Sequence, residues 1–189
     1  MATVNSYTER MPTPDRTSRD AIVHAARDLL EKDGLAGLTM NAVAQRVGVR
    51  APSLYKRVQS REELIRLVAE ATLTALADRL ASASTAADVL NGFREFGHEF
   101  PAAFQLVVMP GAGMPTARVE FGAAASEAIV RVSRELAGVD RALDAARTLT
   151  AWATGFICME LNGNFRLGGD IDQAWEFGAA SVVEAVTAR

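Results

Sequence analysis

Cysteine and histidine are scarce in this sequence, and their scarcity excludes several kinds of chemistry. Cys158 is the single cysteine, so no disulfide forms within one chain, and its apolar neighbours favour a buried, inert thiol. The histidines His24 and His98 stand far apart, and no His/Cys cluster has the spacing of metal ligands. No GxGxxG or GxxxxGK[ST] motif is present to bind phosphate. We therefore expect no metal, no cofactor and no enzymatic activity.

Long hydrophobic runs are absent as well. No apolar stretch approaches the ~20 residues that a membrane span requires, and the first residues lack the apolar segment of a secretory signal. We expect a cytoplasmic protein with no membrane partner. Hydrophobic residues still make up 49% of the 189 residues, which is enough for a globular core.

Acidic residues are missing from one part of the chain. The net charge is −3 overall, but residues 1–66 carry +3 and the remainder carries −6. Such a sign reversal with a basic cluster is typical of a surface that binds a polyanion, although an ordinary solvated charged face is the alternative. No Asp or Glu occurs between Gly34 and Arg61, where the basic residues are Arg46, Arg50, Lys56, Arg57 and, at the end, Arg61 itself.

Residues 38–63 have the pattern of a helix-turn-helix followed by a capped helix. Apolar residues recur at helical spacing from Met40 to Val47, and Gly48 then supplies the backbone freedom for a tight exit. Pro52 opens the next helix, because a proline in the first turn loses no hydrogen bond. The outward side chains of this helix are polar donors and one aromatic, which can reach base edges and phosphates in a major groove. They are Arg50, Ala51, Ser53, Tyr55, Lys56 and Arg57, with Leu54 and Val58 turned inward.

Helical patterns fill the rest of the chain, and no run of alternating β-branched residues favours a sheet. Thr17 or Ser18 caps a first helix that Gly34 stops. Ser60 and Glu63 have the spacing of a capping box, in which each side chain accepts from a free amide at the helix start. Residues 109–116 are rich in proline and glycine and predict a loop, and Asp170 caps the last helix. Beyond the helix-turn-helix, the expected helices cover residues 61–81, 86–99, 102–108, 117–137, 140–162 and 171–187.

The N-terminal quarter resembles the TetR family of bacterial transcriptional repressors. The stretches TMNAVAQRVGV, PSLYKRV and SREEL are similar, in this order, to the family's second, third and fourth helices. Gly34, Leu38 and Thr39 stand at the family's first turn, and the resemblance covers about residues 17–68. It implies that DNA is contacted by Thr39, Asn41, Arg50, Ala51, Pro52, Ser53, Tyr55, Lys56, Arg57 and Arg61.

The C-terminal part resembles the ligand-binding half of one subgroup of this family, which carries Trp or Ala, His and Gly near the start of its penultimate helix. The similar stretches are WATGFICMELNG at 152–163 and DQAWEFG at 172–178, with Thr154 at the position of that histidine. In the family, the last two long helices pair with their twofold mates in a four-helix bundle, so the resemblance implies a homodimer. A dimer also follows from physics, because one short recognition helix contacts few base pairs whereas two related by a twofold axis read a palindrome.

We therefore expect an all-α fold with two helical domains. A flexible arm over residues 1–16 precedes a three-helix helix-turn-helix domain over residues 17–63, which binds DNA. A larger helical domain over residues 64–189 binds a ligand and forms the dimer.

Apolar and aromatic side chains of the C-terminal part are candidates for an effector pocket, with plain core packing as the alternative. Trp152 and Phe156 lie one helical turn apart and flank either the dimer seam or the cavity, and Gly155 beside them is expected to allow close packing. His98 is either a polar group in the pocket or a solvent-facing histidine. The candidates are Phe93, Phe96, His98, Phe100, Phe104, Met109, Met114, Phe121, Trp152, Phe156 and Met159.

Together these observations predict a ligand-responsive transcriptional repressor. It binds a palindromic double-stranded DNA operator as a homodimer and is released by a small, hydrophobic effector. Release requires a half-site spacing that no longer fits the groove period of ~34–36 Å, and the helix over residues 61–81 is expected to transmit the change. The alternative is a small-molecule-binding or catalytic helical protein with a vestigial DNA-binding fold. The basic, acid-free segment favours the repressor.

Overall fold

The computed structural model describes residues 18–187, which form helices and, within that range, no strand. The expected all-α fold is confirmed. The predicted arm over residues 1–16 lies outside the described residues, as does Thr17. No helix between residues 18 and 187 has the length and hydropathy needed to cross a bilayer. The helices are α1 (Arg19–Gly37), α2 (Met40–Arg46), α3 (Ala51–Tyr55), α4 (Arg61–Leu80), α5 (Ala86–Glu99), α6 (Pro101–Val108), α7 (Val119–Ala137), α8 (Ala142–Leu161) and α9 (Ile171–Val186).

Side-chain caps fix the starts of several helices. The Thr39 and Ser60 hydroxyls accept from amides in the first turns of α2 and α4 at 3.2 and 3.1 Å, and the Asp170 carboxylate caps α9 at 2.9 Å. The predicted capping box at Ser60 is displaced, because the Glu63 carboxylate accepts from the amide of Gln59, at 2.7 Å, rather than from that of Ser60. Each cap satisfies an amide that the helix itself leaves unpaired.

Two glycines with positive φ end the first two helical segments. Gly34 (φ 67°, ψ −175°) breaks α1, so the regular repeat stops where the sequence predicts and only a short turn continues to Gly37. Gly48 (φ 75°) closes α2, and the amide of Val49 bonds back to the carbonyl of Ala44 at 2.9 Å. A residue with a Cβ rarely adopts this conformation, which explains the glycine in the turn.

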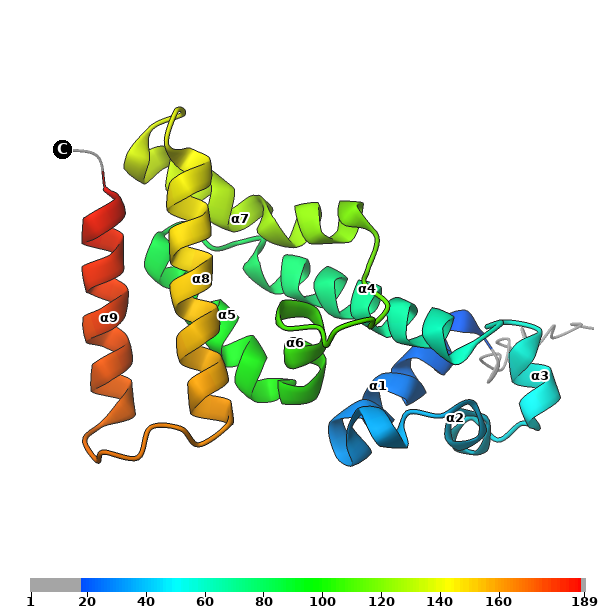
Figure 1. The fold of residues 1–189 in the computed structure, drawn as a ribbon. Helices are drawn as coiled ribbons and strands as arrows, with labels where there is room; N and C mark the ends of the chain where they lie inside the picture. The colour runs from blue at the N-terminus through cyan, green and yellow to red at the C-terminus, as the bar shows by residue number, and fades with distance from the viewer. Residues whose placement is uncertain (1–17, 188–189) are drawn as a thin grey trace, which may run out of the picture.

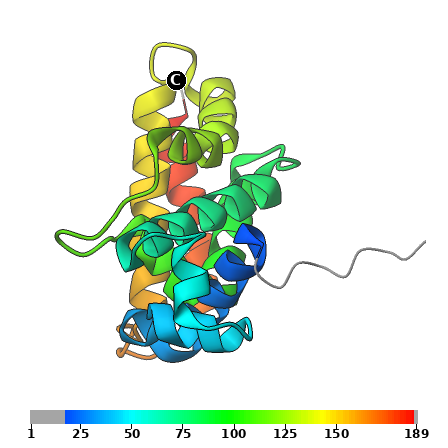
Figure 2. The ribbon, with the colours of Figure 1, turned by 90° about the vertical axis from the view of Figure 1, so that its right-hand side faces the viewer.

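The helices form two packed groups joined by α4 (Figure 1). Helices α1–α3 lie at one end with the N-terminal half of α4, while α8 and α9 lie antiparallel at the opposite end (Figure 1). The loop between α6 and α7 extends away from the body of the molecule (Figure 2). A long helix that belongs to both groups can carry a displacement from one to the other.

Each group has its own hydrophobic core. The first is built from α1, α2, α3 and the start of α4, and it includes Leu54 and Val58, which are fully buried as expected. The second is built from the C-terminal half of α4 with α5–α9. The two cores meet within α4, between Val68 and Leu76.

Candidate nucleic-acid interface and effector cavity

Helix α3 presents polar side chains outward from the end of the molecule formed by α1–α3. Leu54 and Val58 anchor it to the core beneath, and Tyr55 on the opposite side leaves half of its surface exposed. The helix is short, but the amide of Arg57 still bonds to the carbonyl of Leu54 at 2.8 Å and continues the turn. The remaining predicted contact residues of this segment are exposed or, for Ala51, partly exposed: Arg50, Ala51, Pro52, Ser53, Lys56 and Arg57.

Three further residues of the predicted interface lie beside α3. Thr39 and Asn41 are exposed at the start of α2. Arg61 is placed differently, because its guanidinium donates to the carbonyls of Leu38 and Leu35 at 2.7 and 2.6 Å. Arg61 therefore fastens the α1–α2 connection to α4, which is a structural role that the sequence alone did not indicate.

Two acids on the neighbouring helices are paired with basic residues. Asp28 of α1 lies 3.3 Å from Arg46 of α2, and Glu63 of α4 lies 3.1 Å from Arg19 of α1. Because no acidic residue occurs between positions 35 and 60, the exposed surface of α3 keeps the positive character that a polyanion requires.

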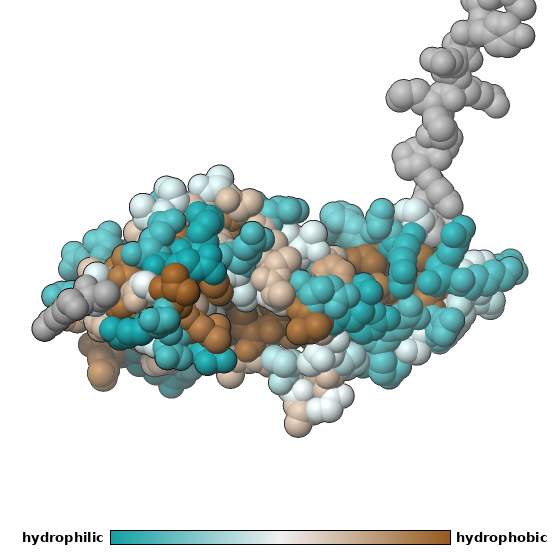
Figure 3. Space-filling view, turned by 90° about the horizontal axis from the view of Figure 1, so that it is seen from above, coloured by the Kyte–Doolittle hydropathy of each residue, from teal (hydrophilic) through white to brown (hydrophobic). Residues whose placement is uncertain are grey.

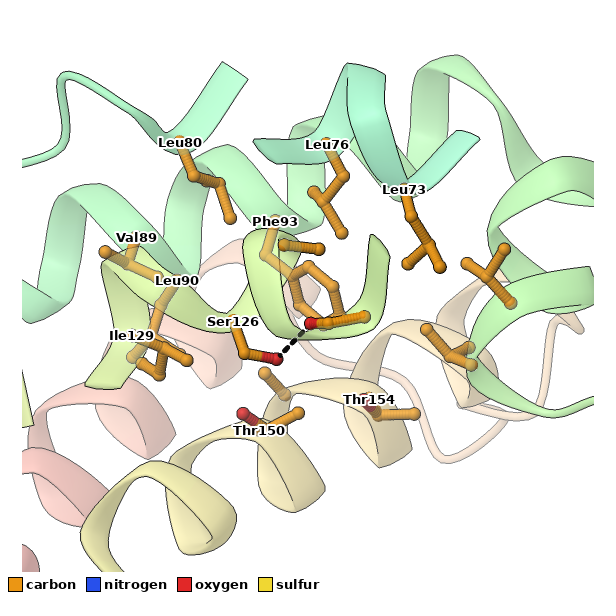
Figure 4. Close-up of a pocket in the computed structure, with 15 residues that line it drawn as sticks. Leu73, Leu76, Leu80, Val89, Leu90, Phe93, Ser126, Ile129, Thr150 and Thr154 are labelled. Carbon is orange, nitrogen blue, oxygen red and sulfur yellow. Dashed lines mark hydrogen bonds between the residues drawn. The ribbon is translucent and has the colours of Figure 1, made fainter. Parts of the chain in front are cut away.

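A cavity of about 300 Å³ lies inside the C-terminal group of helices (Figure 4). Leucines of α4 and apolar residues of α5 form one wall, and α7 and α8 face them with three hydroxyl side chains (Figure 4). Its volume is at the lower end of the range for ligand sites. The lining residues are Leu73, Leu76, Leu80, Val89, Leu90, Phe93, Val107, Val108, Gly122, Ala125, Ser126, Ile129, Thr150, Ala153 and Thr154.

A second cavity of about 420 Å³ adjoins the first and shares Leu73, Val107, Gly122 and Ser126 with it. It reaches the end of the α6–α7 loop at Arg118. In the view from above, apolar side chains are visible in a recess near the middle of the molecule, whereas the end with α1–α3 is mostly hydrophilic (Figure 3). The two cavities together give the apolar interior a connection toward the surface.

Of the eleven pocket candidates predicted from the sequence, the first cavity, of about 300 Å³, includes only Phe93. Phe96 and Phe104 are buried in the C-terminal core, where the Phe104 ring lies 4.9 Å from that of Phe93. Met109 and Met159 are 62% and 44% exposed. These side chains fill the core or face outward, so the structure does not bring them to one site.

Phe100 and Phe121 lie near the contact between the two groups of helices. The Arg27 guanidinium lies 4.0 Å above the Phe100 ring, and the Arg118 guanidinium lies 4.9 Å from the Phe121 ring. Both rings thus face a cation rather than the cavity. Met114, named with the predicted pocket, packs against the N-terminal core.

Trp152 and Phe156 pack with Trp175 of α9 in an aromatic cluster between the last two helices. The ring of Trp175 lies 4.9 Å from that of Trp152 and 5.2 Å from that of Phe156. The expected close packing at Gly155 is wrong within the chain, because no atom lies within 4 Å of a Cβ built there. The close approach is instead at Gly178, where a Cβ would lie 2.5 Å from the Trp152 ring.

His98 belongs to a polar network outside the cavity. Its imidazole lies 2.9 Å from the Glu160 carboxylate, which also accepts from Arg94 of α5 at 3.0 Å. Arg94 reaches Asp172 of α9 at 2.7 Å as well. Burial opposes ionisation of Glu160, but hydrogen bonds from Arg94 and His98 outweigh it and lower the pKa of this carboxyl. The network ties α5, α8 and α9 together.

Sequence reasoning missed two groups of cavity residues, the leucines of α4 and the threonines of α8. Leu73, Leu76 and Leu80 follow the ordinary spacing of a core-facing helix, so their pattern does not distinguish a cavity wall from packed interior. Thr150 and Thr154 stand four residues apart within an apolar helix, and this spacing is the one signal that could have drawn attention to the site.

Glu31 joins α1 of the N-terminal group to α6, a wall of the cavity. Its two carboxylate oxygens accept from the amides of Ala102 and Ala103 at 3.0 and 2.9 Å. Helix α6 has no side-chain cap of its own at Phe100, so a carboxylate from another helix caps it. Any shift of α6 away from α1 must break these bonds.

Glu70 makes a second connection, from α4 to the start of α7. Its buried carboxylate accepts from Arg66 at 2.9 Å and from Arg118, the residue before α7, also at 2.9 Å. Burial opposes ionisation, but the bonds from Arg118 and Arg66 outweigh it and lower the pKa of Glu70. The charged state of Glu70 is thereby stabilised.

No group of three potential metal-ligating side chains is assembled anywhere in residues 18–187. Cys158 is buried as expected, and burial raises the pKa of its thiol. A protonated, inaccessible thiol is a poor nucleophile.

Two family descriptions match the chain. "Bacterial regulatory proteins, tetR family" matches residues 22–68, and "Tetracyclin repressor-like, C-terminal domain" matches residues 86–182. An uncharacterized helix-turn-helix-type transcriptional regulator of Mycobacterium tuberculosis is 29% identical over 160 residues, which are 79% of this chain and 73% of the relative. The class C tetracycline repressor of Escherichia coli is 37% identical over 60 residues, which are 32% of this chain and 27% of the relative.

Solved structures share the whole fold. A protein of unknown function from Rhodococcus sp. RHA1 is 22% identical with a TM-score of 0.75, covering 94% of this chain and 100% of that one. A TetR regulator from Streptomyces coelicolor is 19% identical with a TM-score of 0.68, covering 89% and 97%. A TetR variant from Acinetobacter baumannii in complex with minocycline is 22% identical with a TM-score of 0.64, covering 89% and 95%.

Proposed function

Because the chain belongs to the TetR family of bacterial regulatory proteins, we propose that it is a transcriptional repressor that binds a palindromic operator as a homodimer and is released by a small, hydrophobic effector. The observation that carries the proposal is the exposed, acid-free surface of α2 and α3 above a fully buried Leu54 and Val58. Such a helix can enter a major groove while the helix before it crosses the backbone.

The DNA contacts divide into two kinds. Arg50, Lys56 and Arg57 supply positive charge for phosphates, which gives affinity without sequence choice. Ser53 and Tyr55 lie on the exposed side of α3 and are the candidates for base contacts. Thr39 and Asn41 extend the surface along α2, whereas Arg61 contributes by holding α2 in place.

Exposed apolar side chains on the last two helices support the homodimer. Phe177 of α9 is 76% exposed, and Met159 of α8 is 44% exposed. On α9, Ala174, Phe177, Ser181 and Ala185 recur at helical spacing on one exposed side. A twofold partner that packs its own α8 and α9 against this face would bury these side chains. Gly155 lies on the exposed side of α8 and leaves room for that approach.

The effector occupies the cavity of about 300 Å³ in this proposal. Leu73, Leu76 and Leu80 line it from α4, whose first turns pack in the N-terminal core. Glu31 and Glu70 hold two further walls, α6 and α7, to the N-terminal group. A ligand that displaces these walls would change the distance between the two recognition helices of the dimer. The dimers in this ligand-bound conformation would then dissociate from the operator. The minocycline complex of a relative supports a fold that accepts small molecules.

Selection of bound duplexes from a random DNA pool tests this function. We expect recovered sites with twofold symmetry, a footprint over two half-sites one helical turn apart, and an affinity that falls steeply with salt. Recovery of no sequence, together with weak retention on heparin, would instead favour the helical ligand-binding protein with a vestigial DNA-binding fold.

A further inference from the structure

We propose that the cavity of about 300 Å³ recognises an uncharged, mainly apolar molecule that carries one hydrogen-bond-accepting oxygen, such as a ketone, ester or lactone. The acceptor oxygen lies at Thr150 and Thr154 of α8, and the apolar body lies against α4 and α5. This inference rests on the proposed function, because it names the chemistry of the effector.

The wall chemistry excludes an ionised ligand. None of the residues lining the cavity is Asp, Glu, Lys, Arg or His. A carboxylate or ammonium placed there would lose its hydration without gaining a counter-charge, which is strongly unfavourable. The nearest charge in the adjoining cavity, on Arg118, is already committed to the buried Glu70 carboxylate. Arg118 therefore does not provide a site for an anion.

Two threonine hydroxyls on the cavity wall can donate to a ligand oxygen. Ser126 donates its hydrogen to the Gly122 carbonyl at 2.8 Å (Figure 4). Thr150 and Thr154 stand one turn apart on the same side of α8, and neither hydroxyl bonds to another group within residues 18–187. Each carries an O–H donor. Thr150 is exposed and Thr154 is partly exposed, so each hydroxyl can exchange a water for a ligand oxygen that accepts from it.

The wall opposite the threonines favours a hydrocarbon body for the rest of the ligand. This wall consists of Leu73, Leu76 and Leu80 of α4 with Val89, Leu90 and Phe93 of α5, and all six side chains are apolar. Burial of hydrocarbon against them stabilises the complex in proportion to the area removed from water. The same contacts place the ligand against α4, the helix that joins the two cores.

Three probes that each contain nine carbon atoms test the assignment at pH 7.4: 2-nonanone, nonylammonium and nonanoate. Each competes with the neutral fluorophore N-phenyl-1-naphthylamine, and displacement gives the dissociation constant. We expect the ketone to bind at least about tenfold more tightly than either ion, because only the ketone needs no counter-charge.

Two valine variants test whether the ligand oxygen binds at the threonines of α8. Thr150→Val and Thr154→Val keep the shape of the side chain but remove the donor, and each is expected to weaken 2-nonanone about fivefold, as for one net hydrogen bond. Thr148→Val is the matched control, because the Thr148 hydroxyl bonds to the Asp144 carbonyl and does not line the cavity. It is expected to leave ketone affinity unchanged.

The ligand class is overturned if nonanoate or nonylammonium binds as tightly as the ketone, if no probe displaces the fluorophore, or if both valine variants match Thr148→Val. Operator affinity is measured separately at saturating ketone. If the ketone binds with the expected pattern and DNA affinity does not change, the ligand class holds while the regulatory part of the proposed function fails.

Discussion

Replacement of Glu31 is expected to loosen the connection between α1 of the N-terminal core and α6, which forms a wall of the cavity. The two amides that Glu31 caps belong to Ala102 and Ala103, at the start of a helix whose own N-cap residue provides no side-chain bond. Loss of one helix cap costs about 1 kcal/mol, so Glu31→Ala, which leaves both amides uncapped, should lower the free energy of unfolding by about 2 kcal/mol. Glu31→Gln keeps one acceptor oxygen and should lower it by about 1 kcal/mol.

Urea denaturation at fixed protein concentration, salt and pH measures these changes through the transition midpoint. Glu135→Ala on α7 is the control, because Glu135 is exposed and an exposed substitution should change stability by less than about 0.5 kcal/mol. The reasoning also predicts that Glu31→Ala weakens the effect of a bound ligand on DNA affinity. Equal midpoints for wild type, Glu31→Ala and Glu135→Ala would refute the role assigned to this carboxylate.

Three other expectations address packing, charge and DNA contacts. Gly178→Ala should lower the free energy of unfolding by about 1 kcal/mol, because the cost of overpacking against an indole ring of α8 exceeds the gain in helix propensity. Gly155→Ala, where no neighbour is close, should not lower it. Equal destabilisation of both variants would contradict this difference in packing. The lowered pKa of Glu70 contributes stability above the ordinary glutamate range and loses it as pH falls through the lowered value; urea midpoints of Glu70→Gln should therefore depend less on acid than those of the wild type, and parallel pH curves would count against this. Lys56→Ala should weaken DNA binding broadly and reduce the salt slope by about 1 per subunit, while Tyr55→Ala should weaken it more; unchanged affinity in both would show that this side of α3 does not bind DNA.

Local signals explain how much of the fold the sequence predicted. Thr39 and Asp170 cap the helices that they were expected to cap, and Gly34 and Gly48 end regular helix through conformations that few other residues adopt. Helix α8 begins at Ala142 rather than at residue 140, because the backbone of residues 139–141 forms a turn first. Such boundaries depend on a few neighbouring residues, which is why the sequence contains most of the information about them.

The position of the cavity could not be predicted from the sequence pattern, because it depends on tertiary packing. Aromatic residues such as Phe96 and Phe104 were expected near a ligand, but tertiary packing uses them to fill the core. The cavity instead lies where leucines of α4 meet hydroxyls of α8, and the distance between these helices follows from the packing of the whole bundle. By contrast, the exposed side of α3 was predictable, because buried Leu54 and Val58 fix which side faces outward.

The central claim is that two subunits read one palindromic site through α3. Sedimentation of the protein with a duplex recovered by selection measures it most directly, because the mass of the complex gives the number of chains on each site. We expect two chains on each duplex with both half-sites intact, and loss of high-affinity binding when one half-site is scrambled. A single chain on each duplex, or undiminished affinity for the scrambled site, would contradict the account.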